Sequence, residues 1–317
     1  MRLRLPEITP RRARTLFLIT VLTTLAAGVT NSPVWQRWLL LGELGGFAHS
    51  SLPPWWALSG VWTQAAGFAG ALLGILFAHE MGHYVVGRRE GVEVSWPLFL
   101  PSVPPLGTLG AVIRMRGALE RPGPLLRMAA AGPFAGVVVA VPVIALGLLL
   151  SPSVPVTAQE PGVVRLGVPL LMTGLEWLVL GGSTPGHELM LHPVAFAGWA
   201  GCLVTALNLL PIGQLDGGHI AYALYGPRVR PVARGLVALL AVAGFLYVGW
   251  WMVAALVLWV VRIDHPPLVT PAVVEGPQRW IGLASLALFA LTFMPMPIKG
   301  SGVVDIAGAI ELAWRYR

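Results

Sequence analysis

Five consecutive residues, His79-Glu80-Met81-Gly82-His83, have the side-chain types and the spacing of a metal-dependent hydrolase site. In a helix, positions 79 and 83 lie one turn apart on the same face, so the two imidazoles can bind one zinc ion. Glu80 lies beside them, where its carboxylate can take a proton from a water molecule at the metal. The alternative is a pair of structural histidines. We consider it weak, because ionisable side chains inside an apolar membrane segment are costly unless they serve a function.

A catalytic zinc ion needs a third protein ligand and one open position. Arg89 stands where the extended motif of soluble enzymes has a third histidine. The acidic residues that follow are too close, too cytoplasmic or surrounded by arginines: Glu90, Glu93 and Glu120. Asp216 is the better candidate, because it follows an apolar segment that ends at the same predicted membrane level, where Pro211 and three glycines interrupt the helix. The alternative is an ordinary helix end and turn, for which Asp-Gly-Gly is suitable.

Two polar residues flank Asp216 in this stretch. Asn208 can donate an amide N–H to the oxyanion of a tetrahedral intermediate, or it can cap the interrupted helix. His219 can support a metal ligand or serve as a structural histidine, and we favour the structural role. The remaining histidines fall in predicted loops, and we assign them no catalytic role: His49, His187, His192 and His265.

Three motifs occur in the order found in a known family: HEMGH at 79–83, AGPFAG at 131–136 and NLLPIGQLDGG at 208–218. Through these motifs, residues 60–225 resemble the site-2 protease family of intramembrane metalloproteases. The proline-rich stretch SWPLFLPSVPPLGTLGAVIRM is similar to the branch found in cyanobacteria and chloroplasts. The resemblance implies that His79, His83 and Asp216 are the zinc ligands and that Glu80 is the general base. It also implies that Asn208 lies near the substrate.

The composition indicates that lipid is the solvent for much of the chain. Hydrophobic residues make up 56% of the 317 residues and charged residues only 11%, whereas an average soluble domain is roughly one quarter charged. The single cysteine, Cys202, excludes an internal disulfide framework and a cysteine-based zinc cluster. The net charge of +7 comes from short arginine clusters between apolar runs. This pattern is typical of membrane topology signals and gives no reason to expect nucleic-acid binding.

The apolar runs predict an all-α polytopic membrane protein with about six or seven transmembrane helices. We expect a retained first span at 16–28, not a cleaved signal. The other predicted spans are 60–86, 128–150, 192–210, 280–294 and 232–261, the last as a helical hairpin or one tilted helix, and 166–182 is expected to be interfacial or re-entrant. Arginine clusters at 2–14, 88–89, 114–127 and 228–234 predict a cytoplasmic N-terminus in a multi-pass protein of the cell (inner) membrane.

Residues 97–113 hold four prolines, which rule out a regular helix. After the last of these prolines, the segment 108–115 predicts a short strand or β-hairpin near the active site. A helical substrate must be unwound before cleavage, and an edge strand here can bind the unwound backbone by strand addition. The alternative is a packed re-entrant loop with no role in substrate binding.

We therefore expect one membrane-embedded metalloprotease domain over residues 1–317, without the PDZ or CBS domain that many family members carry. It is expected to bind one Zn²⁺ per chain and to act within the lipid bilayer. The family resemblance implies that it hydrolyses transmembrane segments of membrane proteins, in regulated intramembrane proteolysis. Two alternatives come from other classes. A membrane metal transporter would not need Glu80, and an inactive substrate-binding pseudoprotease would be expected to have lost Glu80 or a ligand.

Overall fold

The computed structural model describes residues 9–36, 55–113, 115–116, 121–156, 164–182, 184–268, 273–306 and 308. The chain forms two compact units, each built from several parts of the sequence. Unit 1 contains Met1–Gly117, Ala135–Val156 and Gly174–Gly201, and unit 2 contains Ala118–Phe134, Thr157–Thr173 and Cys202–Arg317. The predicted site residues are therefore divided between the two units.

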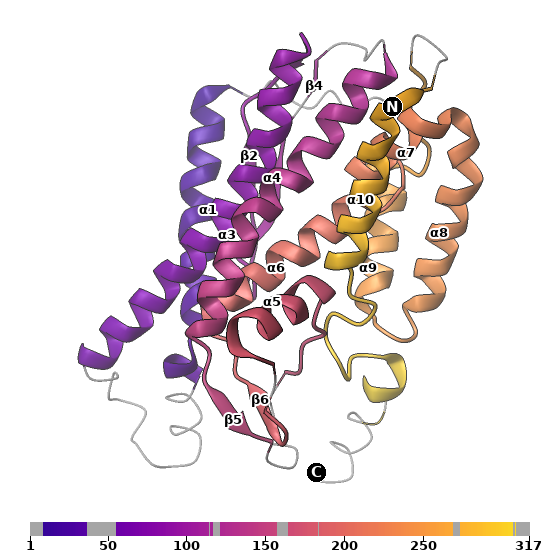
Figure 1. Ribbon diagram of the computed structural model, residues 1–317. Helices are drawn as coiled ribbons and strands as arrows, with labels where there is room; N and C mark the ends of the chain where they lie inside the picture. Colours follow the sequence, from indigo (N-terminus) through magenta and orange to yellow (C-terminus); the bar gives the residue numbers. More distant parts are fainter. Residues whose placement is uncertain are drawn as a thin grey trace. The chain divides into compact units, whose positions relative to one another are not determined.

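Three helices among the described residues are long and apolar enough to cross a membrane. They are α1 (Pro10–Thr30), α3 (Trp55–Arg89) and α4 (Pro122–Leu149), each labelled in Figure 1. Threonine hydroxyls in α1 donate to carbonyls one turn earlier, as Thr20 does to Leu16 at 2.7 Å. Such internal hydrogen bonds are what a lipid environment demands of a polar side chain.

The predicted strand forms within 108–115, and its partner strand lies in the proline-rich segment before it. Strand β2 (Leu98–Pro101) pairs antiparallel with β3 (Thr108–Val112), and the register shifts between Leu100 and Pro101. The shorter strands β1 (Glu93–Val94) and β4 (Met115–Arg116) form a second pair. Within the described residues β3 pairs with β2 alone, so the β2–β3 sheet has two strands.

Helix α1 holds the turn of this hairpin. The hydroxyl of Thr23 donates to the carbonyl of Gly107 at 2.6 Å, and the side-chain amide of Asn31 donates to the carbonyl of Pro105 at 2.7 Å. Gly107 has φ +73°, and a Cβ at this position would overlap the backbone carbonyl of Thr23. The position of the hairpin relative to α1 is thus fixed by direct backbone contact.

The remaining helices of the region 150–210 are shorter. Helix α5 (Leu170–Leu180) has 11 residues, about half of the roughly 20 needed to cross a bilayer. This length agrees with the expectation of an interfacial or re-entrant helix. Helix α6 (Pro193–Asn208) has 16 residues, and the strands β5 (Ser153–Pro155) and β6 (His187–Leu189) pair between α4 and α6 in the chain. The total of six or seven spans stays a prediction.

Unit 2 consists mainly of helices that follow α6. They are α7 (Asp216–Tyr225), the 3₁₀ turn η1 (Gly226–Val229), α8 (Arg230–Ala243), α9 (Gly249–Leu256) with its π-helical extension η2 (Val257–Val261), η3 (Gly276–Gln278) and α10 (Arg279–Thr292). Helices α8 and α9 lie side by side (Figure 1). The segment 232–261 is therefore a helical hairpin, which was the first of the two predicted forms. Its apolar face packs around Trp250, together with Leu210 and Ile212 from the turn after α6.

Candidate metal centre

Helix α3 places the three residues of the HExxH motif inside unit 1. His79, Glu80 and His83 are 3%, 6% and 5% exposed. The two histidines lie one helical turn apart, and their rings meet edge to face with centroids 4.9 Å apart. Polar side chains as buried as these require partners, because an unpaired buried polar group costs free energy.

The distance between the imidazoles fits a shared metal ion. Nε2 of His79 and Nε2 of His83 are 3.1 Å apart. Two nitrogens bound tetrahedrally to one zinc at about 2.05 Å each lie about 3.3 Å apart. A hydrogen bond between the rings has a similar length. A shared metal ion explains two further features. Both Nε2 atoms point to one position, and the carboxylate of Glu80 directly follows His79.

Gly136, the last residue of the AGPFAG motif, packs against His79 within unit 1. A Cβ at Gly136 would lie 3.3 Å from Cβ of His79 and 3.4 Å from its Nδ1. The contact with Cβ is tight enough that the His79 side chain would have to move by a few tenths of an ångström. The helix contact of Gly136 is therefore with a predicted metal ligand.

Asp216 lies in unit 2, where it opens a helix. Helix α6 ends at Asn208, the residues 209–215 form a turn, and α7 begins at Asp216. The two glycines after Asp216 are required, since a Cβ at Gly217 would collide with the carbonyl of Leu209 and one at Gly218 with that of Gly213. The carboxylate thus sits in the first turn of a helix, where the helix dipole stabilises negative charge. The ionised form is also the form in which a carboxylate binds a metal ion.

The structure therefore brings the predicted residues together in two groups. His79, Glu80 and His83 share α3 in unit 1, whereas Asn208 and Asp216 lie at the two ends of one turn in unit 2. His79, His83 and Asp216 make up a donor set that could bind a metal ion, with two imidazoles and one carboxylate. This is one of the ligand combinations common in zinc enzymes with an open coordination position.

One contact of α7 was not indicated by the sequence. His265, expected in a loop, is buried against His219, with Nδ1 of His219 and Nε2 of His265 2.7 Å apart. The two histidines are 46 positions apart in the chain, so no local pattern links them. The two prolines after His265, Pro266 and Pro267, indicate only that this segment is not helical.

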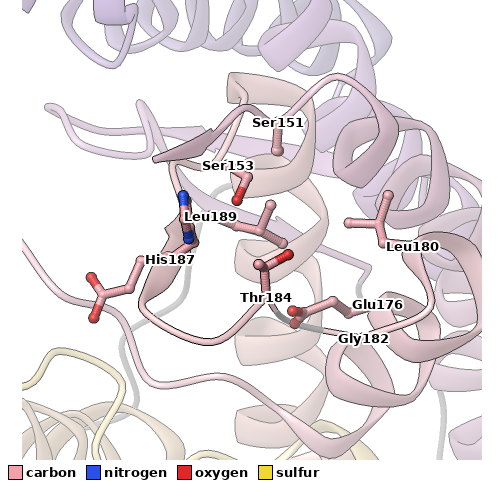
Figure 2. A pocket seen from close by; sticks show the side chains of 9 residues that line it. Ser151, Ser153, Glu176, Leu180, Gly182, Thr184, His187 and Leu189 are labelled. Carbon is pink, nitrogen blue, oxygen red and sulfur yellow. The ribbon is translucent and has the colours of Figure 1, made fainter. Parts of the chain in front are cut away.

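A separate polar pocket lies in unit 1, between the β5–β6 pair and α5. It has a volume of about 220 Å³ and is lined by Ser151, Ser153, Glu176, Leu180, Gly182, Thr184, His187, Glu188 and Leu189. Figure 2 shows Glu176, Thr184 and Leu189 directed toward one another there. None of the predicted catalytic or metal-binding side chains lines this pocket. We therefore do not regard it as the hydrolytic site.

Comparison with known proteins agrees with this chemistry. The chain is similar to the probable zinc metalloprotease EGY2, chloroplastic, of Oryza sativa subsp. indica, with 32% identity over 241 residues, or 73% of this chain and 43% of the relative. It is also similar to EGY2 of Arabidopsis thaliana, with 30% identity over 74% of this chain and 43% of the relative. EGY1 of the same plant is 31% identical over 71% of this chain and 42% of the relative.

The chain thus spans less than half of the length of these relatives, whose names agree with the predicted chloroplast-type branch. The model of peptidase family M50 matches residues 67–248, a segment that includes the HExxH motif, AGPFAG and the turn with Asp216. The chain belongs to peptidase family M50, the site-2 protease family.

Proposed function

We propose that this protein is an intramembrane zinc endopeptidase, formed by a single membrane-embedded domain, that cleaves transmembrane segments of membrane proteins. The observation that carries this proposal is the buried pair His79–His83 on an apolar helix, with Nε2 atoms 3.1 Å apart. A third ligand is needed, and Asp216 is our candidate because family M50 matches its segment and its turn is shaped by close backbone contacts. Zinc, when bound, supplies Lewis-acid polarisation of water and of the scissile carbonyl.

The protein's own groups have distinct roles in the proposed reaction. Glu80 takes a proton from the attacking water and passes it to the leaving amine as the peptide bond breaks. Asn208, at the end of α6, donates its side-chain amide to the oxyanion that forms on the carbonyl. Burial of Glu80 excludes bulk water from its carboxylate, which strengthens its electrostatic interactions.

Substrate binding is proposed to use strand β3. An unwound helix exposes amides that cost several kcal/mol each at membrane depth unless they find partners, about 2–7 kcal/mol by transfer measurements. In β3, Leu109 is 75% and Val112 47% exposed, and among the described residues the strand pairs with β2 alone. These features support strand addition by a substrate over the alternative of a packed loop.

Proline substitutions test this role without touching the metal ligands. Proline at Ala111, Val112 or Ile113 removes one backbone donor, and at one or more of these positions cleavage should fall sharply while zinc content stays normal. Val112→Ala is the matched control, because it shortens the side chain but keeps the amide. If all three proline variants cleave like wild type, strand addition is excluded.

We also propose the orientation of the chain. The arginine clusters at 2–14, 88–89, 114–127 and 228–234 favour a cytoplasmic N-terminus by the positive-inside rule, in a multi-pass protein of the cell (inner) membrane. Single cysteines introduced at Arg88 and Arg230 should react with a membrane-impermeant reagent only after the membrane is opened. If these cysteines react from the outside of intact cells, the orientation is the opposite of the one proposed.

A comparison of membrane-protein fragments tests the function itself. Cells that carry wild-type protein should contain cleavage products that are missing with Glu80→Gln, and Glu275→Gln is a matched control in an exposed loop. The Glu80→Gln protein should still bind zinc. Equal fragments in all three strains, together with zinc binding, would favour the inactive pseudoprotease, and zinc transport that survives Glu80→Gln would favour the metal transporter.

A further inference from the structure

A buried pair of histidines supports the turn that carries Asp216. His219 belongs to α7, three residues after Asp216, and residues three apart lie on the same face of a helix. Its Nδ1 lies 2.7 Å from Nε2 of His265, and the two side chains are 8% and 6% exposed. Tyr222 stacks on the His265 ring with centroids 4.1 Å apart. His265 lies outside the segment that matches the family, which ends at residue 248.

The hydrogen bonds determine which ring nitrogens carry protons. Nδ1 of His265 is 2.5 Å from the carbonyl oxygen of Pro266, and a carbonyl can only accept. Nδ1 of His265 must therefore carry the proton, so that in the neutral ring Nε2 has the lone pair. That lone pair accepts from Nδ1–H of His219. One backbone carbonyl thus sets the tautomer of both rings, with the lone pair of His219 on Nε2.

The backbone of the same loop contacts the turn before Asp216. Gly213, with φ +55°, packs so closely on the carbonyl of Arg262 that a Cβ would collide with it. Arg262 has φ +66° and is the one residue other than glycine with a positive φ in the part of the chain described. Non-glycine residues keep this conformation only where their surroundings enforce it. The ion pair between Arg234 and Asp264 adds little, because its side chains are 63% and 45% exposed.

We propose that His265 is a positioning residue for the metal centre. Through His219, and together with the contact between Arg262 and Gly213, it fixes the first turn of α7 and thereby the direction of the Asp216 carboxylate. This inference rests on the proposed function, because it takes Asp216 as the third zinc ligand. Residues that orient a metal ligand typically change metal affinity by about 10- to 100-fold when they are replaced.

Two substitutions at His265 separate the hydrogen bond from ring packing. His265→Phe keeps a flat ring on Tyr222 but loses the acceptor, whereas His265→Gln loses the ring and offers Oε1 as an acceptor near the position of Nε2. Zinc affinity of the full-length protein in detergent is measured by competition with a chelator. We expect His265→Phe to weaken zinc binding about 10- to 100-fold and His265→Gln to restore most of it. His187→Phe is the control, since His187 is an exposed histidine of β6.

Nitrogen-15 NMR of histidines in the zinc-free wild-type protein gives a second readout that needs no variant to fold. The resonances should show Nδ1 of His219 protonated and its Nε2 unprotonated. The inference is wrong if His219 has the opposite tautomer or if His265→Phe binds zinc like wild type. The variant Asp216→Ala separates the positioning role of His265 from the assignment of Asp216 as the third zinc ligand. Loss of zinc there with normal binding in His265→Phe overturns the positioning role alone, whereas full zinc affinity in Asp216→Ala overturns the third-ligand assignment.

Discussion

Replacing Gly136 with alanine probes the geometry of the metal centre through a single methyl group. The new Cβ would lie 3.3 Å from Cβ of His79 and 3.4 Å from its Nδ1, so the imidazole must move by a few tenths of an ångström. Distances in a zinc site vary by only about 0.2 Å. Such a shift is thus large enough to weaken the bond from His79, and we expect zinc affinity to fall by about tenfold.

Helix propensity acts in the opposite direction and makes the experiment selective. Alanine is favoured over glycine inside a helix by up to about 1 kcal/mol, so Gly136→Ala should not simply unfold the protein. Gly74→Ala is the matched control, because it lies on α3 five residues before His79 and its Cβ would have no neighbour within 4 Å. Chelator competition measures zinc affinity, and thermal unfolding measures stability. If Gly136→Ala binds zinc as tightly as Gly74→Ala, the packing of Gly136 does not position His79.

Three further predictions concern the elements around the site. Gly107→Ala should lower the unfolding temperature more than Gly91→Ala, because both glycines have a positive φ but only Gly107 contacts the backbone of Thr23, whereas Gly91 has no neighbour within 4 Å; equal effects would mean that α1 does not hold the hairpin. Arg262→Gly should be about 1 kcal/mol more stable than Arg262→Ala, since φ +66° is strained for any residue with a Cβ, and urea or thermal unfolding would show the reverse order if the strain were absent. Burial lowers the pKa of His265, and its hydrogen bond to a backbone carbonyl acts in the opposite direction. The folded protein thus binds this proton less readily than the unfolded chain, whose histidines titrate near about 6.5, so stability should be full above that pH and fall below it. In His265→Gln, the loss of stability with falling pH should be smaller than in wild type.

The HExxH motif was predictable because both histidines and the glutamate lie within one helical turn. Their relation depends only on helix geometry, which five residues of sequence determine. Strand β3 was predictable for a similar local reason, since Val112 and Ile113 favour extended structure and the prolines before them exclude a helix. Strand β2, which pairs with β3, lies inside the proline-rich stretch, and no strand was predicted there.

The surroundings of Asp216 were only partly predictable. Proline and glycines correctly indicated a break after α6, but Asp216 begins a new helix there, so it is not part of the turn itself. The reason is tertiary: Gly217 and Gly218 let the new helix start directly against the carbonyls of the preceding turn. The pairing of His219 with His265 could not be predicted, because it depends on how a distant loop packs on α7.

Cleavage by the purified protein tests the central claim most directly. Full-length wild-type protein and Glu80→Gln are reconstituted separately into lipid vesicles with a membrane-protein substrate identified from the fragment comparison, and the products are analysed by mass spectrometry. Both proteins should hold about one equivalent of zinc. Wild type should cut within the transmembrane segment, and Glu80→Gln should be slower by about 10²-fold or more. Cleavage by Glu80→Gln at the wild-type rate, or no cleavage by zinc-loaded wild type of a substrate that depends on it in cells, would contradict the account.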